Sequence, residues 1–241
     1  MSVIITGGSR GIGRAIAVQL AEDGHDVAFC YRGNEDAAKE TAASVESHGR
    51  RVFHKAVDVA SFEEVRSFVG QAEEALGPAT AAVACAGVTR DRSLALMDPA
   101  DWNIVLRTNL DGAFHLARAV SFGMMRRKSG AIVLVSSVAG LSANPGQANY
   151  AASKAGMHGL ASSFCKEAGR YGVRVNVVAP GFIETDMVAT VKPAVRARAE
   201  KDIPLGGFGS PADVAHSVSF LLSERAAYIT GAVLRVDGGL S

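Results

Sequence analysis

Residues 2–13 read Ser2-Val-Ile-Ile-Thr-Gly-Gly-Ser-Arg-Gly-Ile-Gly13, a β-branched run that breaks directly into a glycine-rich turn. The apolar run predicts a buried strand, and the amphipathic residues 12–21 predict a helix that follows it at once. The glycine spacing lets the backbone turn tightly and approach a pyrophosphate, with the N–H groups of a helix N-terminus facing the negative charge. Although a glycine-rich turn alone is only a turn, this placement indicates a variant of the dinucleotide-binding fingerprint.

Six more strand-like runs follow, with helical segments between them. They cover residues 26–31, 52–57, 79–84, 131–136, 174–178 and 232–236. Their unbroken Val, Ile and Ala residues indicate strands that are covered on both faces. With right-handed crossovers, the sequence predicts an α/β fold: a single-domain Rossmann fold with a doubly wound, seven-stranded parallel sheet and helices on both faces.

Composition narrows the class of partner. The chain has 241 residues, 48% of them hydrophobic, and a formal net charge of +1, so we expect one domain with a large core. Scattered Lys and Arg residues argue against nucleic-acid and membrane partners and favour a small molecule. Without an apolar run of spanning length or a signal peptide, we expect a cytoplasmic protein. Cys30, Cys85 and Cys165 lie in apolar surroundings and imply neither a metal site nor disulfides.

Tyr150 and Lys154 are four residues apart in Tyr150-Ala-Ala-Ser-Lys154, thirteen positions beyond Ser137. On a helix they would share one face, and the Lys154 ammonium would lower the pKa of the Tyr150 phenol towards neutral pH. Such a pair suits proton transfer to or from an oxygen. By itself the spacing is also typical of a solvated surface pair.

Ligands of a doubly wound sheet bind at the carboxyl ends of its strands, and the unusual residues of this chain follow those ends. They are residues 7–13, Arg32, Asp58, residues 85–87, Ser137 and Pro180-Gly181. The least regular segment, residues 184–209, is a candidate substrate lid, with Met187, Val188, Val191 and Ile203 expected at the entrance.

Taken together, these motifs resemble the short-chain dehydrogenase/reductase family over the whole chain. The resemblance is carried by Thr6 to Gly13, Asp58-Val59, Asn109, Ser137, Tyr150-x-x-x-Lys154 and Pro180 to Met187. Within the family, residues 147–154 and 180–187 are most similar to the 3-oxoacyl-[acyl-carrier-protein] reductases and the related polyketide ketoreductases. The resemblance implies NADPH-dependent reduction of a 3-oxoacyl thioester in fatty-acid or polyketide biosynthesis, in a homotetramer.

The resemblance also implies catalytic roles for Asn109, Ser137, Tyr150 and Lys154. Tyr150 would give its proton to the carbonyl oxygen while Ser137 orients that oxygen. Lys154 would tune Tyr150 and bond the nicotinamide ribose, and Asn109 would hold a water that links Lys154 to solvent. Ser136 should face away from the site, because successive strand residues point to opposite faces. For Asn109, a loop or capping amide is the alternative.

The expected cofactor-binding residues follow from the same resemblance. They are Gly7, Ser9, Arg10, Gly11, Ile12, Gly13, Arg32, Asp58, Val59, Ala86, Gly87, Tyr150, Lys154, Pro180, Gly181, Ile183 and Thr185. Arg32 stands where an acidic residue would bond a ribose 2′-hydroxyl, and Arg10 supplies a second cation, which favours NADPH over NADH. Asp58 would accept from the adenine amino group, and Ile183 and Thr185 would meet the carboxamide of the nicotinamide. Each arginine alone is also typical of a solvated surface charge.

One departure from the family pattern stands at Cys85, where an asparagine that braces neighbouring loops is common. We expect the thiol to be a tolerated packing residue, with the backbone approach to the cofactor kept at Gly87.

An acidic acyl carrier protein needs a basic patch near the cleft. The candidates are Arg126, Arg127, Lys128, Arg170 and Arg174, although basic residues near helix ends are often only solvated.

Two other functions remain open from the sequence. The first is an NADP-dependent dehydrogenase of another small alcohol or a sugar, with the same four catalytic residues. The second is a non-catalytic dinucleotide-binding redox sensor, which would need the glycine turn but not the proton relay. The apolar residues 227–234 suit a last strand at a subunit interface, or burial within one subunit.

Overall fold

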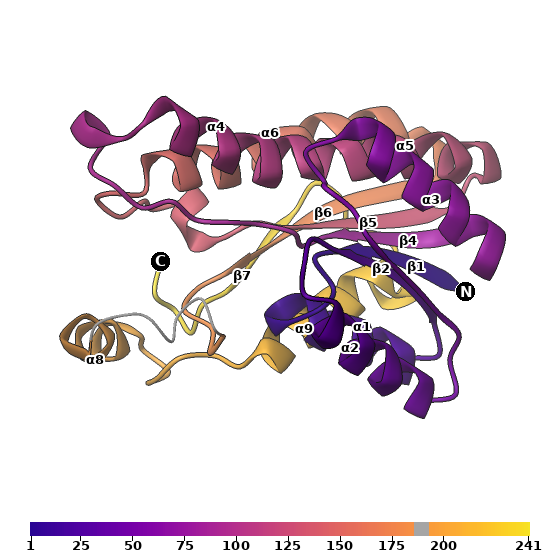
Figure 1. The fold of residues 1–241 in the computed structure, drawn as a ribbon, viewed down its shortest axis with the longest axis horizontal. Coiled ribbons are helices and arrows are strands. Elements are labelled where there is room, and N and C mark those ends of the chain that lie inside the picture. Colours follow the sequence, from indigo (N-terminus) through magenta and orange to yellow (C-terminus); the bar gives the residue numbers. More distant parts are fainter. Residues whose placement is uncertain (186–192) are drawn as a thin grey trace.

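A computed structural model describes residues 1–185 and 193–241 of the chain. Seven parallel strands form one sheet in the order β3-β2-β1-β4-β5-β6-β7 (Figure 1). The strands are β1 (Ser2–Thr6), β2 (Asp26–Tyr31), β3 (Val52–Ala56), β4 (Ala79–Ala84), β5 (Gly130–Val135), β6 (Val173–Pro180) and β7 (Val233–Val236). The predicted doubly wound parallel sheet is confirmed, and each strand begins and ends within two residues of its predicted bounds.

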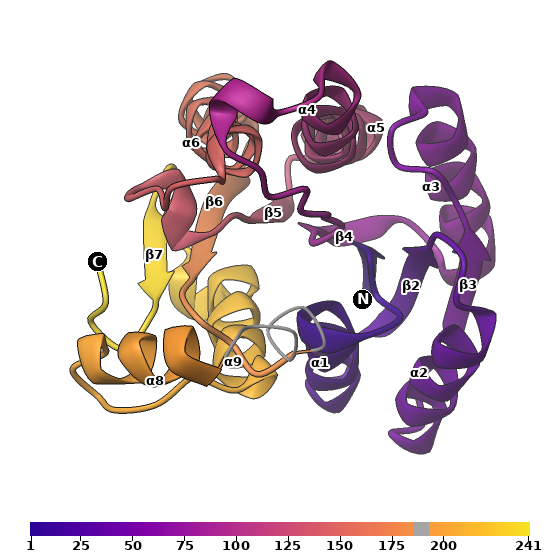
Figure 2. The same ribbon diagram turned by 60° about the vertical axis from the view of Figure 1, so that its left-hand side comes forward.

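Helices cover both faces of the sheet, as Figures 1 and 2 show. One layer contains α3 (Phe62–Leu76), α4 (Pro99–Leu106), α5 (Gly112–Arg127) and α6 (Ala148–Ala168). The other contains α1 (Gly11–Glu22), α2 (Glu35–Ser47) and α9 (Pro211–Leu222), and α8 (Pro193–Asp202) lies beside the C-terminal end of the chain. Short helical turns connect these elements: η1 (Leu94–Leu96), η2 (Arg107–Asp111), η3 (Val138–Gly140), η4 (Gly169–Tyr171) and η5 (Glu224–Ala226).

The core has two halves because successive residues of each buried strand face opposite helix layers. In β1, Ile4 packs with the α3, α5 and α6 side, whereas Val3 and Ile5 pack with the α1, α2 and α9 side. All five residues of β1 are buried. A strand with two covered faces has no polar alternation, which explains why these runs are continuously apolar.

The chain changes direction across the sheet at β1, which pairs in parallel with β2 on one side and β4 on the other. Thr6 at the end of β1 is in register with Cys30 of β2 and Ala84 of β4. The connections that leave β1 and β4 therefore part in opposite directions at the carboxyl edge, and a crevice opens between them. This edge holds the candidate site.

The predicted lid at residues 184–209 has α8 within it, and its positions 186–192, including Met187, Val188 and Val191, lie outside the described residues. Ile203 is 5% exposed, and a Cβ atom added to Gly238 would lie 2.7 Å from it. The Ile203 side chain is thus packed under the C-terminal segment rather than open to solvent. Over residues 1–185 and 193–241, no helix is both long and apolar enough to cross a bilayer.

Candidate active site

A cavity of about 500 Å³ lies at the carboxyl edge of the sheet, where β1, β2, β4 and β5 end. Its lining contains all the predicted cofactor-binding residues except Pro180, Gly181 and Ile183. It also contains residues that were not among the predicted cofactor-binding residues: Cys30, Tyr31, Val57, Cys85, Val88, Thr89, Arg90, Thr108, Val135 and Ser136. Most of these residues lie at or directly beside a predicted strand end. Their position in the sequence could therefore have identified them as lining residues.

The glycine turn forms one wall of the cavity, and two of its residues have no room for a side chain. Gly7 has φ of 72°, and a Cβ atom there would lie 2.8 Å from the Cα of Ala86. A Cβ atom on Gly13 would lie 2.0 Å from the carbonyl oxygen of Gly7. Helix α1 then begins without a side-chain cap at Arg10, which leaves the N–H groups of its first turn for an anion. The turn therefore fits the pyrophosphate of a dinucleotide.

The opposite end of the cavity is formed by residues that follow β2 and β3. Arg32 lies in the cavity wall just beyond β2 and is exposed. Asp58 also lines the cavity, and its carboxylate accepts a hydrogen bond from the N–H of Ala60 at 3.0 Å. Arg10 and Arg32 thus line one cavity with Asp58, so two cations and a carboxylate border the same space.

Ser137 and Tyr150 come from different elements and meet beside this cavity. Ser137 follows β5 and begins η3, where its hydroxyl accepts a hydrogen bond from the N–H of Ala139 at 3.1 Å. Tyr150 lies in the first turn of α6 and is hydrogen-bonded to the Ser137 side chain. Only Tyr150 lines the cavity itself, so Ser137 reaches the candidate site through this phenol.

Lys154 lies one turn further along α6 and is 3% exposed. Its ammonium donates a hydrogen bond to the carbonyl of Val135 at 2.9 Å and lies 5.6 Å from the centre of the Tyr150 ring. Burial lowers the pKa of Lys154 to about 8, and the nearby Cys85 thiol opposes this shift. The cavity therefore contains a cation that can lose its charge slightly above neutral pH.

The expected effect of Lys154 on Tyr150 is wrong for this structure. Burial raises the pKa of Tyr150 to about 12, the Ser137 hydrogen bond lowers it, and Asp91 and Cys85 add to the rise. The Lys154 ammonium lies over the ring and bonds Val135, so it does not offset the cost of burying a phenolate. Tyr150 is consequently held in its protonated form at neutral pH.

Ser136 is hydrogen-bonded to α6 further along the helix than Ser137. Its hydroxyl lies 2.9 Å from the carbonyl oxygen of Lys154 and 2.9 Å from Nε2 of His158. Ser136 was expected to face away from the site, but it lines the cavity, whereas Ser137 lies beside the cavity and lowers the pKa of Tyr150. Ser136 thus holds the turn of α6 that contains Lys154 against the end of β5.

Asn109 is fully buried in η2, between α4 and α5, and does not line the cavity. Its Oδ1 accepts from the N–H of Val88 at 2.8 Å, and its Nδ2 donates to the Val88 carbonyl at 3.0 Å and to Ser153 Oγ at 3.0 Å. A Cβ atom on Gly87 would lie 3.4 Å from Oδ1 and 3.5 Å from the Lys154 ammonium. The amide therefore braces the loop after β4 against α6, beside Lys154.

The three predicted cofactor residues outside the cavity lining follow β6. Pro180 ends that strand, and Gly181 donates its N–H to the carbonyl of Val236 at 2.9 Å. Ile183 is 3% exposed and packs in the core on the α1 and α9 side. Its side chain is thus unavailable to a nicotinamide, and only its backbone is left to face one.

Cys85 lines the cavity and is paired through its backbone with β1. Its N–H and that of Ala86 donate to the Thr6 hydroxyl at 3.2 and 3.3 Å. Burial raises the pKa of the Cys85 thiol to about 11, and Lys154 opposes the rise. The thiol is therefore neutral and packed, as expected for a small apolar side chain. Among the residues that the structure describes, no three His, Cys, Asp or Glu side chains are grouped as metal ligands.

The predicted docking patch does not flank the cleft of its own chain. Arg126 and Arg127 end α5, and Arg170 lies in η4 just before β6 begins. Lys128 adjoins Gly172 at the same place. All four thus lie where β5 and β6 start, at the amino edge of the sheet, whereas the cavity is at the carboxyl edge.

Arg174 is also unsuited to docking, because its guanidinium is already used within the chain. It donates to the carbonyls of Leu221, Leu222 and Ser223 at 2.6, 3.2 and 3.2 Å. These carbonyls end α9 and have no partner within the helix. Arg174 therefore caps α9, and the placement of the patch near the cleft is wrong for these five residues.

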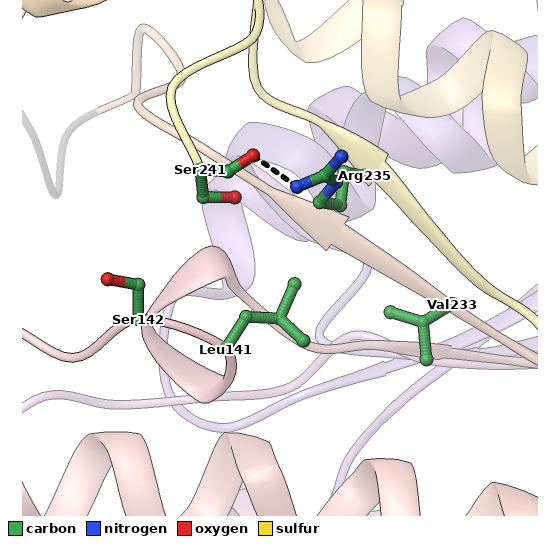
Figure 3. A pocket seen from close by; sticks show the side chains of 5 residues that line it. All are labelled: Leu141, Ser142, Val233, Arg235 and Ser241. Atoms are coloured by element: carbon green, nitrogen blue, oxygen red, sulfur yellow. Dashed lines mark hydrogen bonds between the residues drawn. The ribbon is translucent and has the colours of Figure 1, made fainter.

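A second hollow, of about 420 Å³, lies beside the edge strand β7 (Figure 3). It is lined by Leu141, Ser142, Val233, Arg235 and Ser241. Arg235 donates a hydrogen bond to the carbonyl of the C-terminal Ser241, and Leu141 and Val233 are 49% and 38% exposed. Its lining combines two apolar side chains, two serines and one paired cation, so it lacks the constellation of groups found at the carboxyl edge.

Comparison with known proteins shows similarity over nearly the whole chain. A family model described as enoyl-(acyl carrier protein) reductase matches residues 7–241. The 3-oxoacyl-[acyl-carrier-protein] reductase FabG of Staphylococcus aureus is 41% identical over 99% of this chain and 97% of its own. The FabG of Chlamydia muridarum is 41% identical over 100% of this chain and 97% of its own. The acetoacetyl-CoA reductase of Synechocystis is 40% identical over 98% of this chain and 94% of its own.

Proposed function

Because the chain belongs to the short-chain dehydrogenase/reductase family, whose members use a nicotinamide dinucleotide, we propose that it reduces a 3-oxoacyl thioester to the 3-hydroxyacyl thioester with NADPH. The observation that carries the proposal is the meeting of Tyr150, Ser137 and Lys154 beside the cavity formed by the glycine turn. A carbonyl reduction needs a proton donor, a hydrogen bond to the oxygen and a hydride. The first two are supplied by this chain.

Tyr150 is the proposed proton donor. Its pKa of about 12 keeps the phenol protonated at neutral pH, so it always has a proton to give. Ser137 is hydrogen-bonded to it and can direct its own hydroxyl to the same carbonyl oxygen. The bound nicotinamide dinucleotide supplies the hydride. The Lys154 ammonium lines the same cavity and is proposed to bond the nicotinamide ribose.

Asn109 is proposed to support Lys154. Both of its amide N–H groups are used, by Val88 and Ser153, and one of its Oδ1 lone pairs accepts from Val88. The remaining lone pair is left to accept from a water next to Lys154, through which the proton lost by Tyr150 would be replaced. The rigid position of the amide supports this role.

NADPH is the proposed form of the cofactor. Arg10 and Arg32 line the cavity together, and no carboxylate takes the place of Arg32 at the end of β2. A 2′-phosphate would gain two charge-assisted contacts there, whereas the 2′-hydroxyl of NADH would lose the acidic partner that it usually has. The remaining cofactor contacts are proposed for the cavity residues named above and for the backbone of residues 180–183.

An acyl carrier protein is the proposed bearer of the substrate, in fatty-acid or polyketide biosynthesis. Two of the named relatives act on 3-oxoacyl groups carried by that protein, and a third acts on acetoacetyl-CoA. The family model has a name that refers to enoyl reduction. The phenol and serine of this site suit an oxygen that gains a proton, which favours the ketone over a carbon–carbon double bond.

A cytoplasmic homotetramer with a lid at residues 184–209 completes the proposal. The edge strand β7 offers unpaired backbone groups on one side, and the exposed Leu141 and Val233 lie beside it (Figure 3). A second copy that covers this edge would bury both side chains and protect the strand. The segment around α8 lies close to the C-terminal end, next to this edge (Figure 2).

The proposed chemistry is tested by Tyr150→Phe. The variant should bind NADPH with unchanged affinity but lose at least about 100-fold in turnover, the size expected when a general acid is removed. Tyr171→Phe, which removes the same hydroxyl at the amino edge of the sheet, is the matched control and should keep full activity. Retained turnover in Tyr150→Phe would rule out the phenol as the proton donor and favour a binding protein or another donor.

A further inference from the structure

Arg14 and Thr41 connect the glycine turn to the helix that follows Arg32, and neither residue has a part in the function proposed above. Arg14 lies on α1 and Thr41 on α2. Nε of Arg14 donates to the hydroxyl of Thr41 at 3.0 Å. Thr41 is fully buried, whereas the Arg14 side chain is 35% exposed, so this hydrogen bond is partly buried. We call the two side chains the Arg14–Thr41 clamp.

The clamp holds one carbonyl of the glycine turn. The carbonyl oxygen of Ser9 accepts from Nε of Arg14 at 3.2 Å and from the Thr41 hydroxyl at 3.1 Å. Ser9 directly precedes Arg10, which begins α1 without a side-chain cap. Since no cap fixes this end of the helix, the two side chains that grip Ser9 determine where the backbone of Arg10 lies.

The same clamp also holds the first turns of α2. The Nη2 atom of Arg14 donates to the carbonyl of Ala37 at 3.1 Å and to the carboxylate of Glu40 at 2.9 Å. Asn34 begins α2 by accepting a hydrogen bond from the N–H of Ala37 at 3.0 Å. Arg32 stands two residues before this cap, so the position of the Arg32 backbone follows that of α2.

From these contacts we propose that Arg14 and Thr41 are positioning residues that set the preference for a 2′-phosphorylated cofactor, by fixing the separation of Arg10 and Arg32. The inference rests on the proposed preference for NADPH. A phosphate bound by two cations requires both at a defined distance, because charge-assisted hydrogen bonds weaken steeply when their geometry is lost. An unphosphorylated ribose makes no such double contact and is insensitive to that distance.

The alternative is that the clamp only joins two helices. Loosening it would then weaken all dinucleotides alike, because the glycine turn serves the pyrophosphate of each. The two accounts therefore differ in the ratio of two affinities and not in the affinity for either cofactor alone. That ratio is also independent of the substrate and of the catalytic residues.

The experiment measures dissociation constants of NADPH and NADH for the full chain by fluorescence titration. Thr41→Val keeps the shape of the side chain and removes the hydroxyl that binds both Ser9 and Arg14. Arg14→Met removes all four donated hydrogen bonds and keeps much of the apolar stem. Glu40→Gln is the control for the charge of the Arg14 ion pair, since the Glu40 side chain is 68% exposed and the amide oxygen can still accept from Arg14. Thr41→Ser keeps the hydroxyl and is a second control, and Arg14→Met is the test in the case in which Thr41→Val does not fold.

We expect Thr41→Val and Arg14→Met to weaken NADPH binding about tenfold and NADH binding less than about twofold. Glu40→Gln and Thr41→Ser should keep the wild-type ratio. Equal weakening of both cofactors, or no weakening in either variant, would overturn the inference. A wild-type protein that binds NADH as tightly as NADPH would contradict the proposed cofactor. This result can be distinguished from a failure of the positioning role, because it is measured on the wild type alone.

Discussion

The ammonium of Lys154 donates a hydrogen bond to the carbonyl of Val135 at 2.9 Å, which ties helix α6 to the last residue of β5. The two residues are nineteen positions apart in the chain. The contact buries a cation at the base of the cavity, and burial lowers the pKa of Lys154 to about 8. The charge of the site therefore changes with pH near pH 8, well below the pH range in which a lysine ordinarily titrates.

Cofactor capture should depend on pH through this lysine. Lys154 is charged below its pKa of about 8 and loses the proton above it, whereas Tyr150 keeps its proton up to a pKa of about 12. We therefore expect kcat/KM for NADPH, which reports groups of the free enzyme, to fall as the pH rises through about 8. A profile that stays flat to about pH 9.5 would contradict the assignment to Lys154.

Replacing Lys154 should stabilise the fold while it abolishes activity. The folded pKa of about 8 is below the unfolded value of 10.5, so the unfolded chain binds more protons between these values. The buried cation thus destabilises the protein most below pH 8, and stability rises with pH through that window. We expect Lys154→Met to gain on the order of 1–2 kcal/mol at pH 7 after the lost Val135 contact is subtracted.

Urea denaturation of the cofactor-free chain at several pH values measures this effect. The difference between wild type and Lys154→Met should shrink as the pH rises from 8 towards 10.5. A variant that is less stable than the wild type at neutral pH would show that the Val135 hydrogen bond outweighs the burial of the charge.

Asn109 does not line the cavity, but we expect it to be important for the stability of the fold. Asn109→Leu keeps the approximate volume but leaves both Val88 backbone groups and the Ser153 hydroxyl without their partner. We expect a loss of about 2–4 kcal/mol in the free energy of unfolding, because buried polar groups left unpaired are costly. Ser153→Ala, which removes one of these three bonds, should cost less. Equal costs for the two variants would contradict the bracing role.

Cys85→Asn should change turnover little. Asn109 already braces Val88, and the Thr6 hydroxyl accepts from the N–H groups of Cys85 and Ala86, so the loop does not need a second amide. We expect kcat within about threefold of the wild type, as for a tolerated packing residue. A markedly higher kcat, measured with the same substrate, would show instead that the thiol compromises the site.

Much of the fold was predictable because the decisive signals are local. The apolar residues of β1 and the glycine turn after it specify a strand, a tight turn and a helix within twenty residues. The parallel arrangement follows, since a strand that is buried on both faces and followed by a helix has few other ways to pack. The polar residues at the strand ends then had to meet at one edge, and the cavity there contains most of them.

What the sequence could not predict depends on contacts between distant segments. Arg174 looks like a surface cation, but its partners at the end of α9 are forty-seven to forty-nine residues away. The Tyr150 pKa was expected to fall because Lys154 is near in the helix, yet burial by other elements raises it. Arg126 and Lys128 were expected near the cleft, because the sequence alone does not show at which edge of the sheet a basic patch lies. The burial of a side chain and the edge of the sheet at which it lies are both decided only when the whole sheet has formed.

The most direct test of the account is NADPH consumption with a 3-oxoacyl thioester on acyl carrier protein, compared with a panel of simple ketones and the matching 2-enoyl thioester. The account predicts a kcat/KM for the 3-oxoacyl thioester at least about 100-fold above that for any other member of the panel. Activity confined to the simple ketones, or a preference for the enoyl thioester, would contradict it.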